Sequence, residues 1–538
     1  MAPDVATGAD SSFSERVDSK PLRTNRIFLV GLMVLAVALR LCFWGYTGRT
    51  WEDALITVQH SENAARGLGL THVQEDGRPL HGFTSPLSVL IPLAGDLLSP
   101  GFGLILIRIV SALLGAVSVW LGIAIASRLG LAPPLRWMVG AFLAIEHHQI
   151  LWGMAGMETQ VVVTCYLLAF YLHLKGGSFY TGCSLGLCML ARPDAAFLVA
   201  IVLGFECLRP RMRSRLPRAV AGLLAVYLPW VTFATLYYGS PVPNTIIAKG
   251  LGYGSPLAGF FPATLGKLAR LVIGKARTVF CTLGPAWGGN GTGFVPLFDH
   301  FMISGLAVLA MAIGFVVALR KRDTSALPLF AFSAAYLAYF TVLVPVIFGW
   351  YVVPVVSISI LGTAYGLDHC CRAIQDERAR QRVLVCIAAA YIASLGVILP
   401  TTFQAERNIQ VYVENGGRKQ IGLFLRQVMG RNDTVGAECL GYIGYYSQRL
   451  VYDYPGLCSR TVVNYIRAHP EKRDLSGALH GLRPTYIVVR RSEADPIESW
   501  LKRDYHLVRS FQVAPEHVAR LLRPDRNIDL QFSVFRKN

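Results

Sequence analysis

Charged residues are scarce in this sequence. Of its 538 residues only 16% are Asp, Glu, Lys or Arg, whereas an ordinary soluble domain carries about 25%. In contrast, 53% of the residues are hydrophobic and the mean hydropathy is +0.44. A chain with this composition has too few polar side chains to cover a surface that is exposed only to water. The composition therefore excludes an ordinary soluble protein and indicates that much of the chain lies in lipid.

Metal-binding cysteine patterns and internal repeats are also lacking. The eleven Cys form no CxxC pair and show no zinc spacing, and most lie in apolar segments, where a thiol behaves as a small hydrophobic group. Cys439 and Cys458 lie in a polar region where a disulfide could form, but their separation in sequence does not fix their geometry. The sequence shows no clear repeat, and repeats are typical of carriers.

Basic residues exceed acidic ones, 51 to 33, which gives a net charge of +18. Nucleic-acid binding would gather these charges on one face with interleaved aromatic residues, and no such pattern is present. The Lys and Arg residues fall mostly between long apolar runs, which is the pattern of cytoplasmic loops in membrane proteins. We therefore predict no nucleic-acid partner and interpret the basic charge as a topology signal.

Long apolar runs predict a mainly α, polytopic bundle of about eleven membrane spans. The N-terminus is predicted to be cytoplasmic, because a single threading then places every basic cluster inside. The predicted spans lie near 27–46, 104–127, 136–150, 159–174, 179–191, 194–208, 219–238, 301–319, 327–346, 352–368 and 383–401.

The remaining segments are assigned by composition. Residues 1–25 are polar and predicted to be a disordered cytoplasmic N-terminus, and 26–401 form the membrane domain, with external loops at 47–103 and 239–300. Residues 83–98 are apolar but contain two prolines and Asp96, so we predict an interfacial or re-entrant helix. Residues 402–538 have mixed charge and short β-rich runs, which predicts a small extracytoplasmic α/β domain. Within it, 436–444 reads as a turn-rich segment.

Two adjacent acids, Glu52 and Asp53, follow the first predicted span by about one turn. Acids close to lipid are costly and are functional candidates by default. The alternative is a solvated loop or the first turn of a helix, which an acid suits. Further polar residues favour function, because the threading places them on the same external side: His81, Thr84, Glu158, Arg192, Asp194, Asn244 and Lys249.

Carboxylates and cations on one external face suit a reaction on a lipid phosphate. A carboxylate can act as general base on a hydroxyl, while Lys or Arg balances the charge of a leaving phosphate. This is the chemistry of glycosyl transfer from a polyprenyl-phosphate sugar. Arg192 and Asp194 can equally form a salt-bridged hairpin, and Trp350 and Tyr351 can belong to a membrane belt of aromatic residues.

Several strings, in order along the chain, resemble the GT-C superfamily of polytopic glycosyltransferases. They are most similar to the mycobacterial terminal arabinofuranosyltransferase group and its relatives. The strings are EDALI (52–56), GLGL (67–70), GFTSPL (82–87), GMET (156–159), ARPDA (191–195), YYGSPVPNTIIAK (237–249) and GYIGYYSQRLVYDYPGL (441–457). The resemblance implies a membrane enzyme of the bacterial plasma membrane that transfers a sugar, such as arabinofuranose, to a cell-envelope glycan or lipid-linked acceptor.

The resemblance also implies roles for individual residues. Asp53 inherits the part of general base, and Glu52, which replaces the family's first Asp, that of a second acid or metal ligand. Some members bind a divalent cation and others do not, so no cofactor is assigned and a divalent cation stays open. The remaining assignments are Arg192, Lys249 and Asn244 at the donor phosphate, and His81, Thr84, Glu158, Asp194, Trp350 and Tyr351 in the substrate pocket.

Two other functions remain open at this stage. Many spans with polar residues also describe a transporter of lipids or solutes, although here the polar residues cluster at one face. A non-catalytic scaffold is a third interpretation, supported by Glu52 at the position of the family's Asp.

Overall fold

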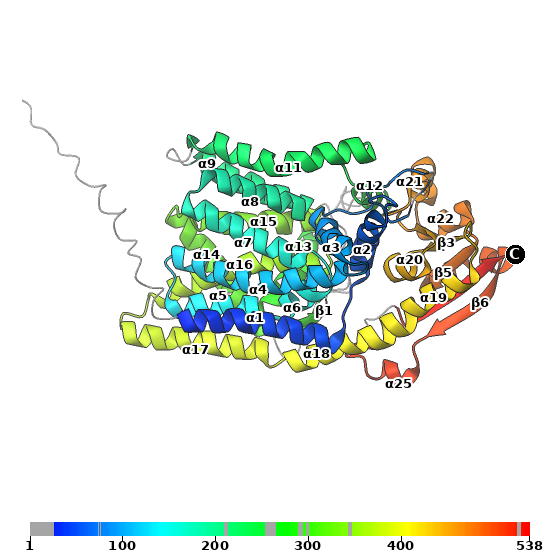
Figure 1. The fold of residues 1–538 in the computed structure, drawn as a ribbon. Helices are drawn as coiled ribbons and strands as arrows, with labels where there is room; N and C mark the ends of the chain where they lie inside the picture. The colour runs from blue at the N-terminus through cyan, green and yellow to red at the C-terminus, as the bar shows by residue number, and fades with distance from the viewer. Residues whose placement is uncertain are drawn as a thin grey trace, which may run out of the picture.

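The computed structural model describes residues 26–73, 75, 77–208, 213–252, 265–288, 294–296, 301–342, 347–524 and 529–538. The predicted disordered segment 1–25 lies outside these residues. A bundle of roughly aligned helices forms the larger part of the molecule, and a smaller domain with a sheet lies at one end of it (Figure 1).

Within the described residues every predicted span overlaps helical structure, although 136–150 and 383–401 are each divided between two helices. Six helical segments are long and apolar enough to cross a bilayer, or seven if one bent pair counts as a single span, so the number eleven remains a prediction. The six are α1 (Arg26–Thr47), α4 (Gly103–Arg128), α11 (Leu216–Tyr238), α14 (Phe301–Arg320), α16 (Gly349–Cys371) and the segment Glu377–Val428.

Shorter helices fill the bundle. The predicted span 136–150 is interrupted at Glu146, whose carboxylate caps a new helix by accepting hydrogen bonds from the N–H groups of His148 and Gln149 at 3.0 and 2.9 Å. The next two helices, α6 and α7, meet at a bend of 118°. The shorter helices are α5 (Pro133–Ile145), α6 (His147–Met154), α7 (Thr159–Lys175), α8 (Ser178–Ala191), α9 (Ala196–Leu208) and α15 (Leu327–Val342).

The two predicted external loops contain helices at the end of the bundle that faces the smaller domain (Figure 1). The first loop holds α2 (Glu52–Ala65) and α3 (Leu87–Leu98), and the prediction of a short helix over 83–98 corresponds to α3. The second holds α12 (Asn244–Gly252), α13 (Leu265–Phe280), the 3₁₀ turn Cys281–Leu283 and the small hairpin of β1 (Ala286–Gly288) and β2 (Phe294–Pro296).

The last membrane helix continues into the smaller domain. Helical structure runs from α17 (Glu377–Gly396) through α18 (Leu399–Asn408) and the π-helical segment η4 (Ile409–Arg418) to α19 (Lys419–Val428). The domain boundary predicted at residue 402 therefore lies inside a helix. A rod of this kind connects the two parts of the molecule by regular backbone rather than by a linker.

The C-terminal domain has a five-stranded mixed sheet of order β4-β3-β5-β7-β6. Strands β3 (Thr434–Ala437), β4 (Leu450–Asp453) and β5 (Tyr486–Arg490) are parallel, and β6 (Tyr505–Gln512) and β7 (Gln531–Lys537) run antiparallel to their neighbours. Its helices are α20 (Gly441–Ser447), α21 (Arg460–Ala468), α22 (Leu475–Leu482), α23 (Arg491–Ala494), α24 (Glu498–Asp504) and α25 (Pro515–Val518), with 3₁₀ turns at Pro470–Lys472 and Asp495–Ile497.

One prediction about this domain needs correction, and one question that the sequence left open is answered. The segment 436–444 is not turn-rich, because Gly436 lies in β3 and Gly441 begins α20. Cys439 and Cys458 are free thiols, so they form no disulfide. The Cys439 sulfur instead accepts a hydrogen bond from Arg490, and the Cys458 thiol donates to the carbonyl of Gly82 at 3.4 Å.

Candidate functional site

The start of α2 is fixed by contacts from the membrane helices. Arg108 on α4 donates hydrogen bonds to the carbonyl of Arg49 and the hydroxyl of Thr50, both at 2.7 Å. The N–H of Trp51 donates to the carbonyl of Ala155 at 2.9 Å. The chain therefore enters α2 in a defined direction, with Glu52 and Asp53 in its first turn.

Asp53 lines a cavity of about 330 Å³ between the membrane helices and the C-terminal domain, which we call the α2 front cavity. Most of the residues predicted from the sequence meet there, although they come from six separate segments of the chain. The predicted residues that line it are Asp53, Thr84, Glu158, Arg192, Asp194, Lys249, Trp350 and Tyr351.

The carboxylate of Asp53 has no hydrogen-bond or ion-pair partner among the described residues. Burial raises its pKa above the ordinary value of 3.8, and Lys249 opposes this shift while Glu158 adds to it. A carboxylate with a raised pKa and free lone pairs is suited to accept a proton from a bound hydroxyl.

A chain of polar contacts holds Arg192 at the wall of the cavity. Its guanidinium pairs with Asp194 at 3.0 Å and lies 3.8 Å from Glu158. Glu158 also accepts a hydrogen bond from Ser85 at 3.2 Å, and Asp194 accepts one from Tyr336 at 3.0 Å. The salt bridge that the sequence allowed for Arg192 and Asp194 thus exists, and both residues line the cavity as well.

Tyr351 lies between the two cations of the site. Its hydroxyl accepts a hydrogen bond from Lys249 at 3.3 Å, and its ring lies 4.3 Å from the Arg192 guanidinium carbon. Trp350 is only 5% exposed and packs against Trp51 and Trp152 at 5.4 and 5.2 Å between ring centroids. Trp350 therefore belongs to a buried aromatic cluster and not to a membrane belt.

The C-terminal domain contributes one wall of the cavity. Leu457, in the loop after β4, lines it. Asn244 at the start of α12 holds this loop by donating hydrogen bonds to the carbonyls of Gly456 and Leu457 at 2.7 and 3.1 Å. Asn244 thus shapes the site from behind, which is the part the resemblance gave it, and does not itself line the cavity.

His81 was predicted in the substrate pocket, but the structure places its side chain outside the cavity. The ring stacks on Tyr238 at 4.5 Å and packs edge to face against Phe83 at 4.8 Å. Burial lowers its pKa to about 3, so the ring is neutral. His81 was predicted because it is a polar residue in the first external loop, but its ring takes part in a buried aromatic contact.

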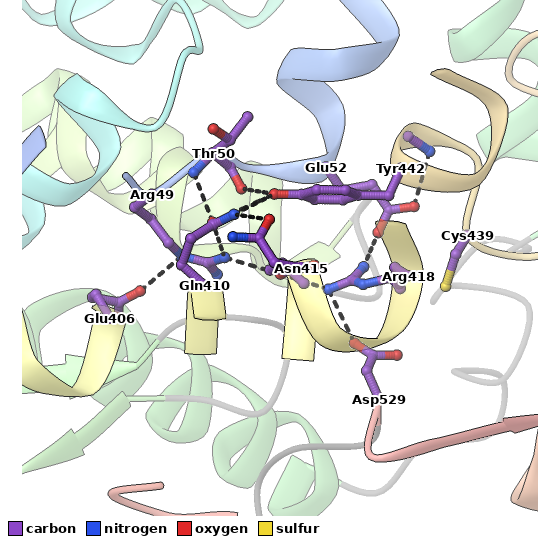
Figure 2. Close-up of polar contacts among 12 residues, drawn as sticks. Arg49, Thr50, Glu52, Glu406, Gln410, Asn415, Arg418, Cys439, Tyr442 and Asp529 are labelled. Atoms are coloured by element: carbon purple, nitrogen blue, oxygen red, sulfur yellow. Dashed lines mark hydrogen bonds and ion pairs between the residues drawn. The ribbon is translucent and has the colours of Figure 1, made fainter. Parts of the chain in front are cut away.

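Glu52 points away from the cavity toward the C-terminal domain (Figure 2). Its carboxylate accepts the N–H of Gly441 at 3.0 Å and forms an ion pair with Arg418. Burial raises the pKa of Glu52 to about 8, opposed by Arg418 and reinforced by neighbouring acids. The prediction that Glu52 shares a site with Asp53 is therefore corrected: it is engaged in a contact between domains.

Glu52 belongs to what we call the arginine network, which consists of Arg49, Arg418 and four carboxylates. Arg49 pairs with Glu406 and Glu414, each at 2.9 Å, and Arg418 pairs with Glu414 at 2.8 Å and Asp529 at 3.3 Å (Figure 2). The network joins the end of the first membrane helix, the helical rod and the C-terminal sheet domain. Buried charges require such pairing.

No metal site is evident among the described residues. They contain no group of three or more His, Cys, Asp and Glu side chains placed to hold a metal ion. Because Glu52 and Asp53 face different surroundings, they do not form the pair of oxygen ligands that the sequence allowed.

Thr245, which lines the cavity, and Tyr336, which contacts two of its lining residues, escaped sequence analysis. Tyr336 on α15 donates hydrogen bonds to Asp194 and to the carbonyl of Tyr351, and Thr245 exchanges a hydrogen bond with Thr84 at 3.0 Å. Thr245 lies within the string YYGSPVPNTIIAK, which could have indicated it. Tyr336 lies in the middle of an apolar span and carries no comparable signal.

Comparisons with known proteins identify the architecture. The crystal structure of ArnT from Cupriavidus metallidurans bound to undecaprenyl phosphate matches with a TM-score of 0.58 and 11% identity, over 94% of this chain and 97% of that chain. The oligosaccharyltransferase of Archaeoglobus fulgidus matches with a TM-score of 0.56 and 13% identity, over 87% and 69%. This chain has the GT-C fold. The predicted fold class, a polytopic helical bundle with a small α/β domain, is confirmed, and the GT-C chain is a multi-pass membrane protein.

The other comparisons add little about activity. The mycobacterial arabinofuranosyltransferase AftD matches at 14% identity with a TM-score of 0.45, over 95% of this chain and 40% of that chain. A domain of unknown function, DUF8728, matches residues 404–531, nearly the whole C-terminal domain. The search of curated proteins gave no match. At these identities the comparisons show the fold of the GT-C chain and leave its substrates open.

Proposed function

We propose that the GT-C chain is an inverting glycosyltransferase that moves a sugar from a polyprenyl-phosphate donor to a hydroxyl of a cell-envelope glycan or lipid-linked acceptor. The observation that carries this proposal is the unengaged carboxylate of Asp53 in the same cavity as Lys249 and Arg192. A base and two cations around one space match the two charges that develop in this reaction, a proton lost by the acceptor and a negative charge gained by the leaving phosphate.

Asp53 acts on the acceptor. Its carboxylate removes the proton of the acceptor hydroxyl while the hydroxyl oxygen attacks the anomeric carbon of the sugar. The bond from that carbon to the phosphate oxygen breaks, and the polyprenyl phosphate leaves with the electron pair. Attack from the face opposite the leaving phosphate inverts the anomeric centre. The raised pKa of Asp53 makes the carboxylate a stronger base than a free aspartate.

Lys249 and Arg192 act on the donor phosphate. Arg192 is already paired with Asp194 and Glu158, whereas Lys249 has only the hydroxyl of Tyr351 as a hydrogen-bond partner among the described groups. We therefore assign the main contact with the phosphate to Lys249. Arg192 provides a second positive charge, and its pairing with Asp194 and Glu158 holds the guanidinium in place.

The remaining walls suit a prenyl chain. Phe340, Phe348 and Ile246 line the cavity beside the polar groups. Among proteins of the same fold, ArnT was solved with undecaprenyl phosphate, and the archaeal oligosaccharyltransferase AglB with dolichol-phosphate. These neighbours support a lipid phosphate as the donor carrier here. The family resemblance favours a pentofuranose such as arabinofuranose as the sugar, and the bacterial plasma membrane as the location.

A transfer assay tests the proposal. Purified protein is given a panel of undecaprenyl- and decaprenyl-phosphate sugars, and release of polyprenyl phosphate is measured without a vesicle gradient. We expect Asp53→Asn to abolish release, a loss of at least about a hundredfold for a general base, while undecaprenyl phosphate still binds. Lys249→Met should mainly weaken binding of undecaprenyl phosphate.

Two outcomes would contradict the proposal. Full turnover in Asp53→Asn would show that Asp53 is not the general base. Wild-type protein that releases polyprenyl phosphate from none of the donors would favour a transporter. Lys502→Met serves as the control, because Lys502 lies outside the cavity, on α24 of the C-terminal domain, and its side chain is largely exposed.

A further inference from the structure

We infer that the paired hydroxyl groups of Thr84 and Thr245 bind a hydroxyl of the transferred sugar and so select the donor. The two side chains line the front cavity, and their hydroxyl oxygens lie 3.0 Å apart. The inference rests on the proposed function, because it takes the sugar to be bound in this cavity together with its phosphate. It adds a group that recognises the sugar itself, whereas Lys249 and Arg192 act on the phosphate.

Most of the hydroxyl protons at the described lining of the cavity are already used within the protein. Ser85 donates to Glu158 at 3.2 Å, and Ser88 donates to the carbonyl of Ser85 at 2.7 Å. Thr57 donates to the carbonyl of Ala54 at 3.0 Å. The serine and threonine residues that line the cavity are Thr57, Thr84, Ser85, Ser88 and Thr245.

The pair of Thr84 and Thr245 differs from these residues because it keeps a proton for a ligand. Each hydroxyl has one proton and can accept two hydrogen bonds. The contact within the pair uses one of the two protons, and neither hydroxyl forms another hydrogen bond among the described residues. The contact is only partly buried, and Thr84 is partly exposed. The pair therefore offers both a donor and acceptors to the cavity.

Helix α12 places the pair beside the expected position of the phosphate. Thr245 and Lys249 are four residues apart on this helix, and side chains at this spacing lie on one face, about 5–6 Å apart at Cβ. Ile246 and Gly250 also line the cavity, so this face of α12 is turned toward it. A sugar attached to a phosphate on Lys249 therefore lies within reach of Thr245.

Thr84 connects the pair to the other cation of the donor site. It precedes Ser85 in the segment before α3, and Ser85 donates a hydrogen bond to Glu158. The carboxylate of Glu158 lies 3.8 Å from the Arg192 guanidinium. The position of the pair is thus fixed by two separate external loops, one on each side of the donor site.

The chemistry of the pair favours a neutral sugar hydroxyl over the other parts of the donor. The pair carries no charge, so the phosphate is better served by the two cations, and the prenyl chain has no polar group to bind. A sugar hydroxyl both donates and accepts, as the pair does. A site that hydrogen-bonds a substrate hydroxyl discriminates against an analogue that lacks it, because its own polar groups are then left unpaired. The donor class that fits is a polyprenyl-phosphate sugar with a free hydroxyl close to its anomeric carbon.

Binding to Asp53→Asn protein tests the inference without turnover. The full chain in detergent is titrated calorimetrically with undecaprenyl phosphate and with its arabinofuranose, mannose and glucose derivatives. For the sugar donor that binds tightest, we expect Thr84→Val combined with Thr245→Val to weaken binding about fivefold to tenfold, the effect of one lost hydrogen bond. Binding of undecaprenyl phosphate itself should be unchanged, which also shows that the variant is folded.

Two further variants separate the hydroxyl groups from the shape of the side chains. Valine keeps the branched shape of threonine without its hydroxyl. Thr84→Ser combined with Thr245→Ser keeps both hydroxyls without the methyl groups, and it should restore most of the binding. Thr235→Val is the matched control, because Thr235 is exposed on α11 and its hydroxyl donates to the carbonyl of Val231 at 2.8 Å.

Donors that lack a single sugar hydroxyl identify the group that the pair binds. The donor without this hydroxyl should bind equally well with and without the two valine substitutions, whereas the other deoxy donors should still lose affinity. Equal losses for every deoxy donor would show that the valines act through the shape of the cavity and would overturn the inference.

Three other results would overturn it. They are unchanged binding of the sugar donor by the valine variant, an equal loss for the sugar donor and undecaprenyl phosphate, and no sugar donor that binds more tightly than undecaprenyl phosphate. Failure of the proposed function gives a different result. Sugar-donor binding that depends on the pair, without transfer by wild type, would contradict only the enzyme. Transfer by wild type with unchanged donor binding in the valine variant would contradict only the role of the pair.

Discussion

Glu52 and Asp53 are neighbours in the sequence, yet their side chains have different partners. Asp53 faces the front cavity with no described partner, whereas Glu52 is held by Arg418 and the N–H of Gly441. Adjacent residues of a helix differ by 100° in direction, so two acids in a row rarely serve one site. The family resemblance assigned the base to Asp53, and the geometry supports the same choice.

The pKa of Asp53 gives a prediction for the pH dependence of transfer. Burial raises this pKa and Lys249 lowers it, so the carboxylate is protonated, and inactive as a base, up to a higher pH than a free aspartate. We expect the acid limb of the pH profile of kcat to lie above pH 3.8 and to move to higher pH in Lys249→Met. An acid limb at the same pH in Lys249→Met and in wild type would show that Lys249 does not affect the pKa of Asp53. Lys502→Met should leave the limb where it is.

At the scale of elements, the arginine network fixes the first turn of α2 to the C-terminal domain (Figure 2). Arg418 is nearly buried and pairs with Glu52, Glu414 and Asp529. Removal of one partner from a buried ion network leaves uncompensated charges, which is far more costly than loss of an exposed pair.

Arg418→Leu should therefore lower the free energy of unfolding by about 3–5 kcal/mol, measured by denaturation in detergent. Transfer by the folded fraction should also fall, because the first turn of α2 loses its anchor. Lys502→Ala is the control: its pair with Glu498 is largely exposed, and such pairs contribute about 1 kcal/mol or less. Equal effects of the two substitutions would show that the network does not hold the domains together.

Close helix packing in the bundle gives a second prediction for elements. A Cβ at Gly366 on α16 would collide with the carbonyl of Ala310 on α14, whereas Gly305 on α14 has open space around it. Small residues at such crossings let membrane helices approach. Gly366→Ala should cost about 1–3 kcal/mol through overpacking and lower the melting temperature, and Gly305→Ala should not. A melting temperature for Gly366→Ala equal to that of wild type would contradict this packing.

At the scale of the whole molecule, the C-terminal domain is part of the candidate site. The helical rod Glu377–Val428 connects it to the bundle (Figure 1). The arginine network fixes it, and Leu457 contributes to the front cavity. The base and the lipid phosphate must then lie on the side of the membrane that holds this domain. The basic loops predict that this side is extracytoplasmic.

Fusion reporters test the topology. Alkaline phosphatase, which folds only outside the cytoplasm, should be active when fused after Asn538 and inactive when inserted at Gly130, between α4 and α5. The opposite pattern would invert the threading and place the candidate site in the cytoplasm. A fluorescent protein that folds in the cytoplasm should give the reverse result at both positions.

The sequence by itself determined the membrane fold and the position of the membrane helices, and it indicated the five charged residues in the described lining of the front cavity. Apolar length and the placement of Lys and Arg act locally, so they can be read along the chain. Ordered strings with three acids and two cations also lie in the primary structure, and six of the residues predicted from them line one cavity, together with Trp350 and Tyr351.

Only the tertiary structure decided which polar residues face the cavity. His81 is as polar as Thr84 in sequence, but packing turns its ring toward Tyr238. Glu52 forms an ion pair with Arg418, a residue 366 positions away. Tyr336, in an apolar span, donates a hydrogen bond to Asp194. The direction of a side chain depends on partners brought together by folding.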